Sequence, residues 1–187
     1  MGIHIIHIKN PILREIFSYV KIIVVAFLLV FILNHFIIAN VNVPTGSMKN
    51  TIMENDRLIG FRLSYLFSSP ERGDIIIFKY PDDESINYVK RVIGLPGDIV
   101  QIIHGKVYVN DEELDEPYIR EPMQDNSQEL TYIVPQDSYF VMGDNRNNSR
   151  DSRYWETTNY VSKDKILAKA LFKYYNGDKH SITFQTF

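Results

Sequence analysis

A serine next to a glycine lies in residues 43–50 (VPTGSMKN), directly after a long apolar run. Ser47 has two interpretations: it turns the chain, or it is a nucleophile that works close to a membrane. A serine nucleophile needs a base to accept its proton. The chemistry therefore depends on whether the chain offers a suitable base.

Histidine, the usual base, occurs only in unpromising contexts. Two histidines precede the apolar run, one lies inside it, one falls in a predicted hairpin turn and one is near the C-terminus: His4, His7, His35, His104 and His180. A Ser-His-Asp triad is therefore poorly supported. A lysine can replace histidine if burial keeps its amine neutral.

Lys90 is the candidate base, in the strand-like residues 87–93 (NYVKRVI). In an alternating strand Lys90 shares a face with Tyr88, while the adjacent Arg91 shares the other. One of the two cations must then point inward or into a crevice. Burial would lower the pKa of Lys90 from about 10.4. The alternative is a solvated lysine on an edge strand, which is common because lysines are almost never fully buried.

A third polar segment, residues 143–153 (GDNRNNSRDSR), follows an apolar strand. A calcium loop is disfavoured because Arg146 falls where an oxygen ligand is needed. Residues 147–149 form a glycosylation sequon, a short pattern that arises often by chance. A surface loop held by Asp–Arg pairs remains the structural alternative to a catalytic role.

The element that precedes these residues is a predicted membrane helix over residues 19–39. Its length matches the ~20 residues that cross a bilayer, and its one charge, Lys21, can snorkel. The alternatives are a cleaved signal peptide and a buried core helix. The sequence around Ala39 is a poor small-x-small cleavage site, which disfavours the first.

The charges flanking this helix predict its direction. After it, the next lysine or arginine is Lys49. The positive-inside rule then places residues 1–18 in the cytoplasm and residues 40–187 outside. Ser47 lies only eight residues beyond Ala39, which fully extended span about 28 Å, so the site is expected close to the outer interface. The charges on the N-terminal side are Lys9, Arg14 and Lys21.

The exported part reads as a mainly β domain. A polar excursion over residues 111–129 is expected at the surface, and His104-Gly105 is a hairpin turn. Apolar and alternating runs predict strands at 57–63, 74–80, 88–93, 99–103, 106–109, 132–134 and 139–142.

Composition excludes several classes of protein. The chain of 187 residues has a formal net charge of −3, which gives no reason to expect nucleic-acid binding. It contains no cysteine, which excludes disulfides, thiolate metal sites and a cysteine nucleophile.

Together these segments resemble bacterial type I signal peptidases. The anchor, PTGSM (44–48), GDIIIF (73–78), YVKRVIGLPGD (88–98) and GDNRNNSRDSR (143–153) stand in the order of that family. The resemblance runs from the anchor to about Trp155. It implies a mainly β, signal-peptidase/LexA-like fold preceded by one transmembrane helix, and it favours the buried interpretation of Lys90.

The resemblance also implies the roles of the site residues. Ser47 is the nucleophile and Lys90 the general base of a Ser-Lys dyad. The oxyanion hole is the backbone N–H of Ser47 with the hydroxyl of Thr45. Ser149 is expected to hydrogen-bond Lys90, and three further residues brace the site: Asp144, Asp151 and Arg153.

The implied substrate is a pre-protein, cut after a small-x-small (Ala-x-Ala-like) sequence. Asn50 stands where the family often has proline, which leaves the local rigidity near Ser47 open. The implied substrate-binding positions are apolar or mostly apolar, with ordinary core as the alternative: Val41, Val43, Pro44, Met48, Ile52, Tyr88 and Val89.

The expected partners are signal peptides of secreted pre-proteins and the lipid bilayer near the protein-export channel, with no nucleic acid, cofactor or metal. The expected location is the bacterial cell membrane, in a Gram-positive-like form because no long insertion separates Lys90 from Asp144. The alternatives are a LexA-like self-cleaving repressor, a conjugation-pilus maturation peptidase, and an anchored domain that binds a partner without catalysis.

Overall fold

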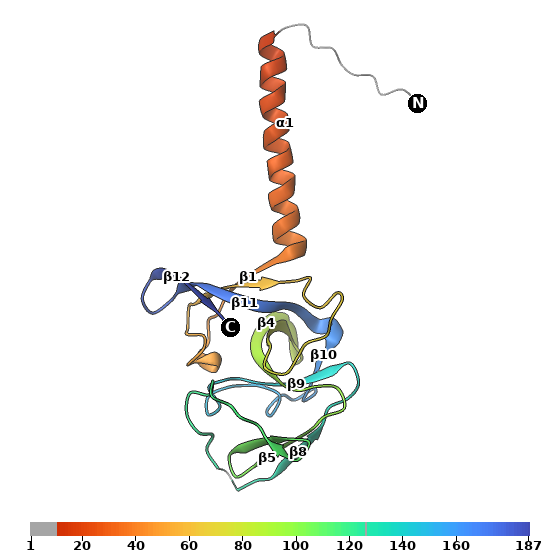
Figure 1. Cartoon of the computed structure of the whole chain (residues 1–187), viewed down its shortest axis with the longest axis vertical. Coiled ribbons are helices and arrows are strands. Elements are labelled where there is room, and N and C mark those ends of the chain that lie inside the picture. Colours follow the sequence, from red (N-terminus) through yellow and green to blue (C-terminus); the bar gives the residue numbers. More distant parts are fainter. Residues whose placement is uncertain (1–10, 126) are drawn as a thin grey trace. The chain divides into compact units, whose positions relative to one another are not determined.

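A computed structural model describes residues 11–125 and 127–187 of the chain (Figure 1). The chain divides into two units, Met1–Ile37 and Ile38–Phe187. The first ten residues of the predicted cytoplasmic segment 1–18 lie outside the described residues.

The first unit contains one long helix. α1 (Pro11–Ile32) continues into a π-helical turn, Leu33–Ile37. The resulting stretch Pro11–Ile37 is, by length and composition, able to cross a membrane, and an 18-residue window within it has a mean hydropathy of 2.8. Residues 22–33 of this stretch are all apolar and none of its residues is buried in the structure, which is the pattern of a helix that needs an apolar solvent.

The bounds of this helix differ from the expected 19–39. The helix already includes residue 11, where proline suits a first turn, and it ends at Ile37. Ile38 and Ala39 belong instead to β1 (Ile38–Asn42), where Ala39 is buried. Pairing with β2 therefore takes these two apolar residues away from the helix.

The second unit is built on an eight-stranded antiparallel sheet in the order β1-β2-β11-β3-β4-β9-β10, with β12 paired to β11. β3 and β4 form a hairpin, and β9 pairs with β4 only from Arg91 to Gly94. The strands are β2 (Arg57–Phe61), β3 (Ile75–Tyr80), β4 (Asp83–Gly94), β9 (Ser138–Met142), β10 (Val161–Ser162), β11 (Ile166–Asn176) and β12 (Ser181–Thr186).

A smaller sheet of four strands, ordered β7-β6-β5-β8, completes the unit. In Figure 1, β5 and β8 lie apart from β1, β11 and β12, with β9 and β10 between them. The turn between β5 and β6 is His104-Gly105, and both residues have positive φ, 48° and 74°, as a tight hairpin requires. Its strands are β5 (Ile99–Ile103), β6 (Lys106–Val109), β7 (Glu112–Glu113) and β8 (Leu130–Ile133).

The mainly β prediction is confirmed, and the predicted strands correspond to β2, β3, β4, β5, β6, β8 and β9. β11, which lies in the middle of the main sheet, was not predicted from the sequence. The alternation of buried and exposed residues along β11 is hard to recognise in the sequence. The buried residues Ala168 and Ala170 are small, and the buried Lys173 is charged and lies 3.0 Å from Asp56. A lysine on a buried face can be recognised only when its partner is known.

Candidate active site

Ser47 lies in a short 3-10 turn, Gly46–Met48, which follows β1. Asn145 holds this turn from outside: its backbone N–H donates to Ser47 O (3.0 Å) and its side chain donates to Gly46 O (2.9 Å). The contact requires Gly143 to lack a side chain, because a Cβ there would lie 2.3 Å from Ser47 O. The GDNR segment therefore presents Ser47.

Lys90 lies on β4 beside this turn, with only 3% of its surface exposed. Its Nζ donates to Ser47 Oγ (2.7 Å) and to Val89 O (3.0 Å), and it lies 4.8 Å from the centre of the Tyr88 ring. Burial lowers the pKa of Lys90 from 10.5 to about 8, although the nearby Asp151 and Asp144 oppose the shift. The amine is therefore poised to lose its proton near physiological pH.

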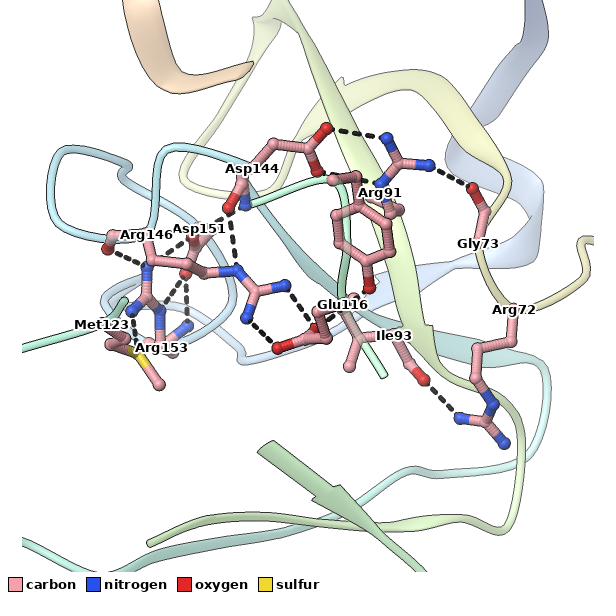
Figure 2. A network of polar contacts seen from close by, with 12 residues as sticks. Arg72, Gly73, Arg91, Ile93, Glu116, Met123, Asp144, Arg146, Asp151 and Arg153 are labelled. Atoms are coloured by element: carbon pink, nitrogen blue, oxygen red, sulfur yellow. Dashed lines mark hydrogen bonds and ion pairs between the residues drawn. The ribbon is translucent and has the colours of Figure 1, made fainter. Parts of the chain in front are cut away.

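Both adjacent cations are buried, which the alternation argument did not anticipate. Arg91 is 9% exposed and makes a two-pronged contact with Asp144, at 2.9 and 2.7 Å, while also donating to Gly73 O at 2.8 Å (Figure 2). Arg91 thus has a full counter-charge. Lys90 has no ion pair among the described residues, which is why the lysine and not the arginine can become neutral.

Asp144 links the two catalytic segments. Its Oδ2 accepts a hydrogen bond from Thr51 Oγ1 (2.5 Å), just after the nucleophile turn, and the same carboxylate binds Arg91 beside Lys90. Its own exposure is 0%. The structure thus places Asp144 where it supports the relative positions of Ser47 and Lys90.

Asp151 and Arg153 form a second buried pair (Figure 2). The Nε and Nη2 atoms of Arg153 donate to the two oxygens of Asp151 at 2.7 and 2.8 Å. Asp151 in turn accepts from the backbone N–H of Gly143 (3.0 Å). The pair braces residues 143–153 into the shape that reaches Ser47.

The hydrogen bond expected from Ser149 to Lys90 is not formed. Ser149 Oγ is buried and has no hydrogen-bond partner among the described residues. The hydroxyl packs against Gly143 instead, since a Cβ on that glycine would lie 2.3 Å from it. Lys90 satisfies its donors with Ser47 Oγ and Val89 O.

Thr45 is exposed beside the nucleophile, and its Oγ1 lies 3.4 Å from Ser47 Oγ. The hydroxyl therefore faces the same space as the serine, as an oxyanion donor must.

The space around Ser47 is a pocket of about 210 Å³. Of the seven expected substrate positions, Tyr88 is the one whose surface is part of this pocket, within the part of the chain that the structure describes. The pocket is lined by Thr45, Gly46, Ser47, Tyr88, Lys90, Asn148 and Arg150.

The other expected substrate positions have different surroundings. Pro44 is exposed and Val41 is half-buried against the core. The remaining four lie in one buried cluster and expose at most 7% of their surface, so the core alternative describes them in this structure: Val43, Met48, Ile52 and Val89.

Residues 111–129 were expected as a plain surface excursion, and instead part of them, the 115–125 segment, contacts Arg91 and residues 143–153. Glu116 contacts the buried Arg146 through two hydrogen bonds of 2.6 Å (Figure 2). The Tyr118 ring lies 4.0 Å from the guanidinium of Arg91. Met123 Sδ accepts from Arg153. Acidic and aromatic residues at 116 and 118 were the available signal, but their partners are distant in sequence.

The arrangement contains the parts needed for acyl transfer by a serine. A nucleophilic hydroxyl lies next to a buried amine, a second hydroxyl faces the reacting oxygen, and two buried ion pairs fix the loops that carry them. The described residues contain no group of three or more His, Asp or Glu that could hold a metal ion.

Comparison with known proteins shows the family of the chain. A family model described as signal peptidase, peptidase S26, matches residues 16–175. The chain belongs to this signal peptidase family.

Individual proteins that are similar to this chain are also named signal peptidases. The chain is 42% identical over 138 residues to "Probable signal peptidase I-2" of Synechocystis sp., covering 71% of this chain and 61% of that protein. It is 42% identical over 140 residues to signal peptidase I of Leptolyngbya laminosa, covering 71% and 66%. The matched region thus spans under two thirds of the length of these two relatives.

A solved structure is also similar. The crystal structure of a signal peptidase I from Enterococcus faecalis V583 shares 32% identity, covers 55% of this chain and 97% of its own, and has a TM-score of 0.47.

Proposed function

We propose that this protein is a membrane-anchored serine endopeptidase that removes N-terminal signal peptides from exported pre-proteins, cleaving after a small-x-small sequence. The observation that carries the proposal is the 2.7 Å contact between Ser47 Oγ and the buried Lys90 Nζ. Family membership supports the reaction class.

Lys90 acts as the general base. In its neutral form the amine has two N–H groups and one lone pair; Val89 O accepts one N–H, and the lone pair is free to face Ser47 Oγ. Lys90 takes the proton as Ser47 attacks the scissile carbonyl carbon. It then returns the proton to the leaving amine, and a water activated by the same amine hydrolyses the acyl-enzyme.

The developing oxyanion is stabilised by the Thr45 hydroxyl and the Ser47 backbone N–H. Removing one donor of this kind typically costs ~3 kcal/mol of transition-state stabilisation. Thr45→Val keeps the shape and removes the hydroxyl, so kcat should fall by about a hundredfold with a smaller change in KM.

Strand geometry supports binding of an extended substrate. β1 is an edge strand of the main sheet, and β4 has β3 as its strand neighbour before Arg91. An extended peptide can add to such edges, where backbone hydrogen bonds supply affinity. Small substrate side chains suit this arrangement because the side chains of Val43, Met48 and Val89 already fill the space beneath.

The decisive experiment uses the purified full chain in detergent with a pre-protein substrate. Ser47→Ala and Lys90→Ala should each abolish cleavage while circular dichroism and thermal unfolding remain those of a folded protein. Normal cleavage by either variant would refute the assignment.

The proposed setting is a single-pass protein of the bacterial cell membrane, N-terminus inside, catalytic unit outside, near the export channel. Ten residues link Ile37 to Ser47, which limits the covalent tether to about 35 Å. The substrate must then be cut close to the membrane from which it emerges.

A further inference from the structure

We infer, on the basis of the proposed function, that Asn148 and Arg150 form a subsite for the substrate residues that follow the scissile bond, and that this subsite favours an acidic side chain. Neither residue has a part in the dyad, the oxyanion hole or the bracing ion pairs described above.

The subsite is continuous with the active site. Asn148 and Arg150 line the pocket of about 210 Å³ that contains Ser47 and Lys90. The same two residues also line a second, larger pocket of about 450 Å³, completed by Asn147, Ser149, Tyr154 and Glu156. A chain that crosses Ser47 can therefore pass directly from one pocket into the other.

The polarity of the two sides gives the direction of the substrate. Of the positions proposed for the small residues before the scissile bond, Tyr88 lines the Ser47 pocket, and four others lie in the buried apolar cluster next to it: Val43, Met48, Ile52 and Val89. The second pocket is polar and is lined by residues within 147–156. Because small apolar side chains suit the apolar surroundings, we assign the polar pocket at Asn148 and Arg150 to the residues that follow the scissile bond.

The guanidinium of Arg150 is held at this junction. It lies 3.6 Å from Asp82 Oδ2 and 5.9 Å from the centre of the Tyr80 ring. Asp82 is itself fixed, because it accepts hydrogen bonds from Tyr80 Oη (2.5 Å) and from the backbone N–H of Thr157 (2.8 Å). The β3–β4 turn therefore positions the cation beside the pocket.

The cation also has donors to spare. Its one hydrogen-bonded carboxylate is Glu156, 3.0 Å away and 82% exposed, and Arg150 itself is 53% exposed. Such an exposed pair is weak, so a substrate carboxylate can displace Glu156. A guanidinium binds carboxylates through two parallel hydrogen bonds, which makes an acidic side chain the best fit.

The test measures kcat/KM of the full-length enzyme on a pre-protein series with Glu, Gln or Lys at the first or second residue after the cleavage site. We expect the wild type to prefer Glu over Gln by about fivefold at low salt, with Lys the poorest. Arg150→Gln should remove the preference, and Arg150→Lys should retain only part of it, because an ammonium keeps the charge and cannot make the two parallel hydrogen bonds. The preference should also shrink in 1 M salt, where screening acts over about 3 Å.

Lys106→Gln is the matched control. Lys106 is likewise an exposed cation paired with an exposed glutamate, Glu113, but it lies on β6 of the small sheet. This variant should keep the wild-type preference. An equal preference in wild type and Arg150→Gln overturns the inference, as does an effect that appears only when the acid precedes the scissile bond or a preference for Lys. Absence of cleavage on every substrate would instead refute the proposed function.

Discussion

At the residue scale, the proposed chemistry depends on Lys90, which has no counter-ion among the described residues. Lys90 and Arg91 are adjacent and both are buried, yet only Arg91 has a carboxylate partner. Burial of an unpaired amine favours its neutral form. Because the neutral form is the active one, the rate at low substrate should rise through the pKa of about 8, by about fivefold between pH 7 and pH 8. A kcat/KM that is flat or falls over this range, with folding intact, would contradict the assignment of Lys90 as base.

The same pKa predicts how stability depends on pH. The amine has a pKa of about 8 in the folded protein and about 10.4 when unfolded, so the unfolded chain binds more protons between these values. Burial of the charged amine thus lowers the free energy of unfolding by about 3 kcal/mol below pH 8. This loss disappears as the pH rises to 10.4. Lys90→Met should be more stable than wild type at pH 7 in urea unfolding, with the difference shrinking by pH 10. A difference independent of pH would show that the amine is not desolvated.

Asn50 is explained by the structure. Its φ is 97°, a value that proline cannot adopt and that asparagine tolerates. Its side-chain N–H₂ donates to Tyr118 O (3.0 Å) and Ile119 O (3.4 Å). Asn50 thus supplies by a tertiary contact the rigidity that a proline supplies by its ring.

Substitutions separate these two properties of Asn50. Glycine can adopt the positive φ of residue 50 but has no side chain to make the two hydrogen bonds. We therefore expect Asn50→Gly to lower the free energy of unfolding by about 1 kcal/mol. Asn50→Pro forbids the observed φ and should lose about 3 kcal/mol or more. Urea titration of both variants distinguishes these values. If Asn50→Pro were as stable as wild type, the positive φ would not be required.

At the scale of elements, the 115–125 segment supports the proposed active site. Glu116 holds the buried Arg146, and Arg146 donates through Nε to Gly143 O (3.1 Å), next to the loop residues that present Ser47. The segment therefore acts on the nucleophile through two contacts. No periodicity in its sequence indicates this, because the contacts are made by single side chains.

Glu116→Gln tests this coupling. Removing the carboxylate leaves the Arg146 cation buried without its counter-charge, which typically costs about 3 kcal/mol of stability. We also expect kcat to fall by a larger factor than KM rises, because the substitution displaces Ser47 and leaves the bound substrate in place. Glu113→Gln is the control, since its pair with Lys106 is exposed and should matter little. Equal effects of the two substitutions would remove the 115–125 segment from the mechanism.

At the scale of the whole molecule, the chain joins an apolar helix to a β unit of opposite solvent preference. Because the chain has no cysteine, single introduced cysteines report topology cleanly. In intact spheroplasts, a membrane-impermeant maleimide should label Lys106→Cys, whereas Lys9→Cys should react only after permeabilisation. The reverse pattern would invert the proposed topology.

The sequence alone determined the strands of the hairpins and indicated Ser47 and Lys90 as the proposed dyad. β5 and β6 carry their own turn signal, and local patterns of this kind need no distant partner. Ser47 and Lys90 were predicted from ordered motifs, and the structure brings them into contact.

Only the tertiary structure decided which polar side chains are buried and which residues surround them. β11 was not predicted because Asp56, the partner of its buried Lys173, is remote in sequence, and the role of Glu116 was not predicted because Arg146 also lies outside its local segment. Ser149 was expected on Lys90 and packs on Gly143. In each case the determining quantity is the burial of a charge or hydroxyl and the atoms that surround it, which depend on the folded chain and not on local pattern.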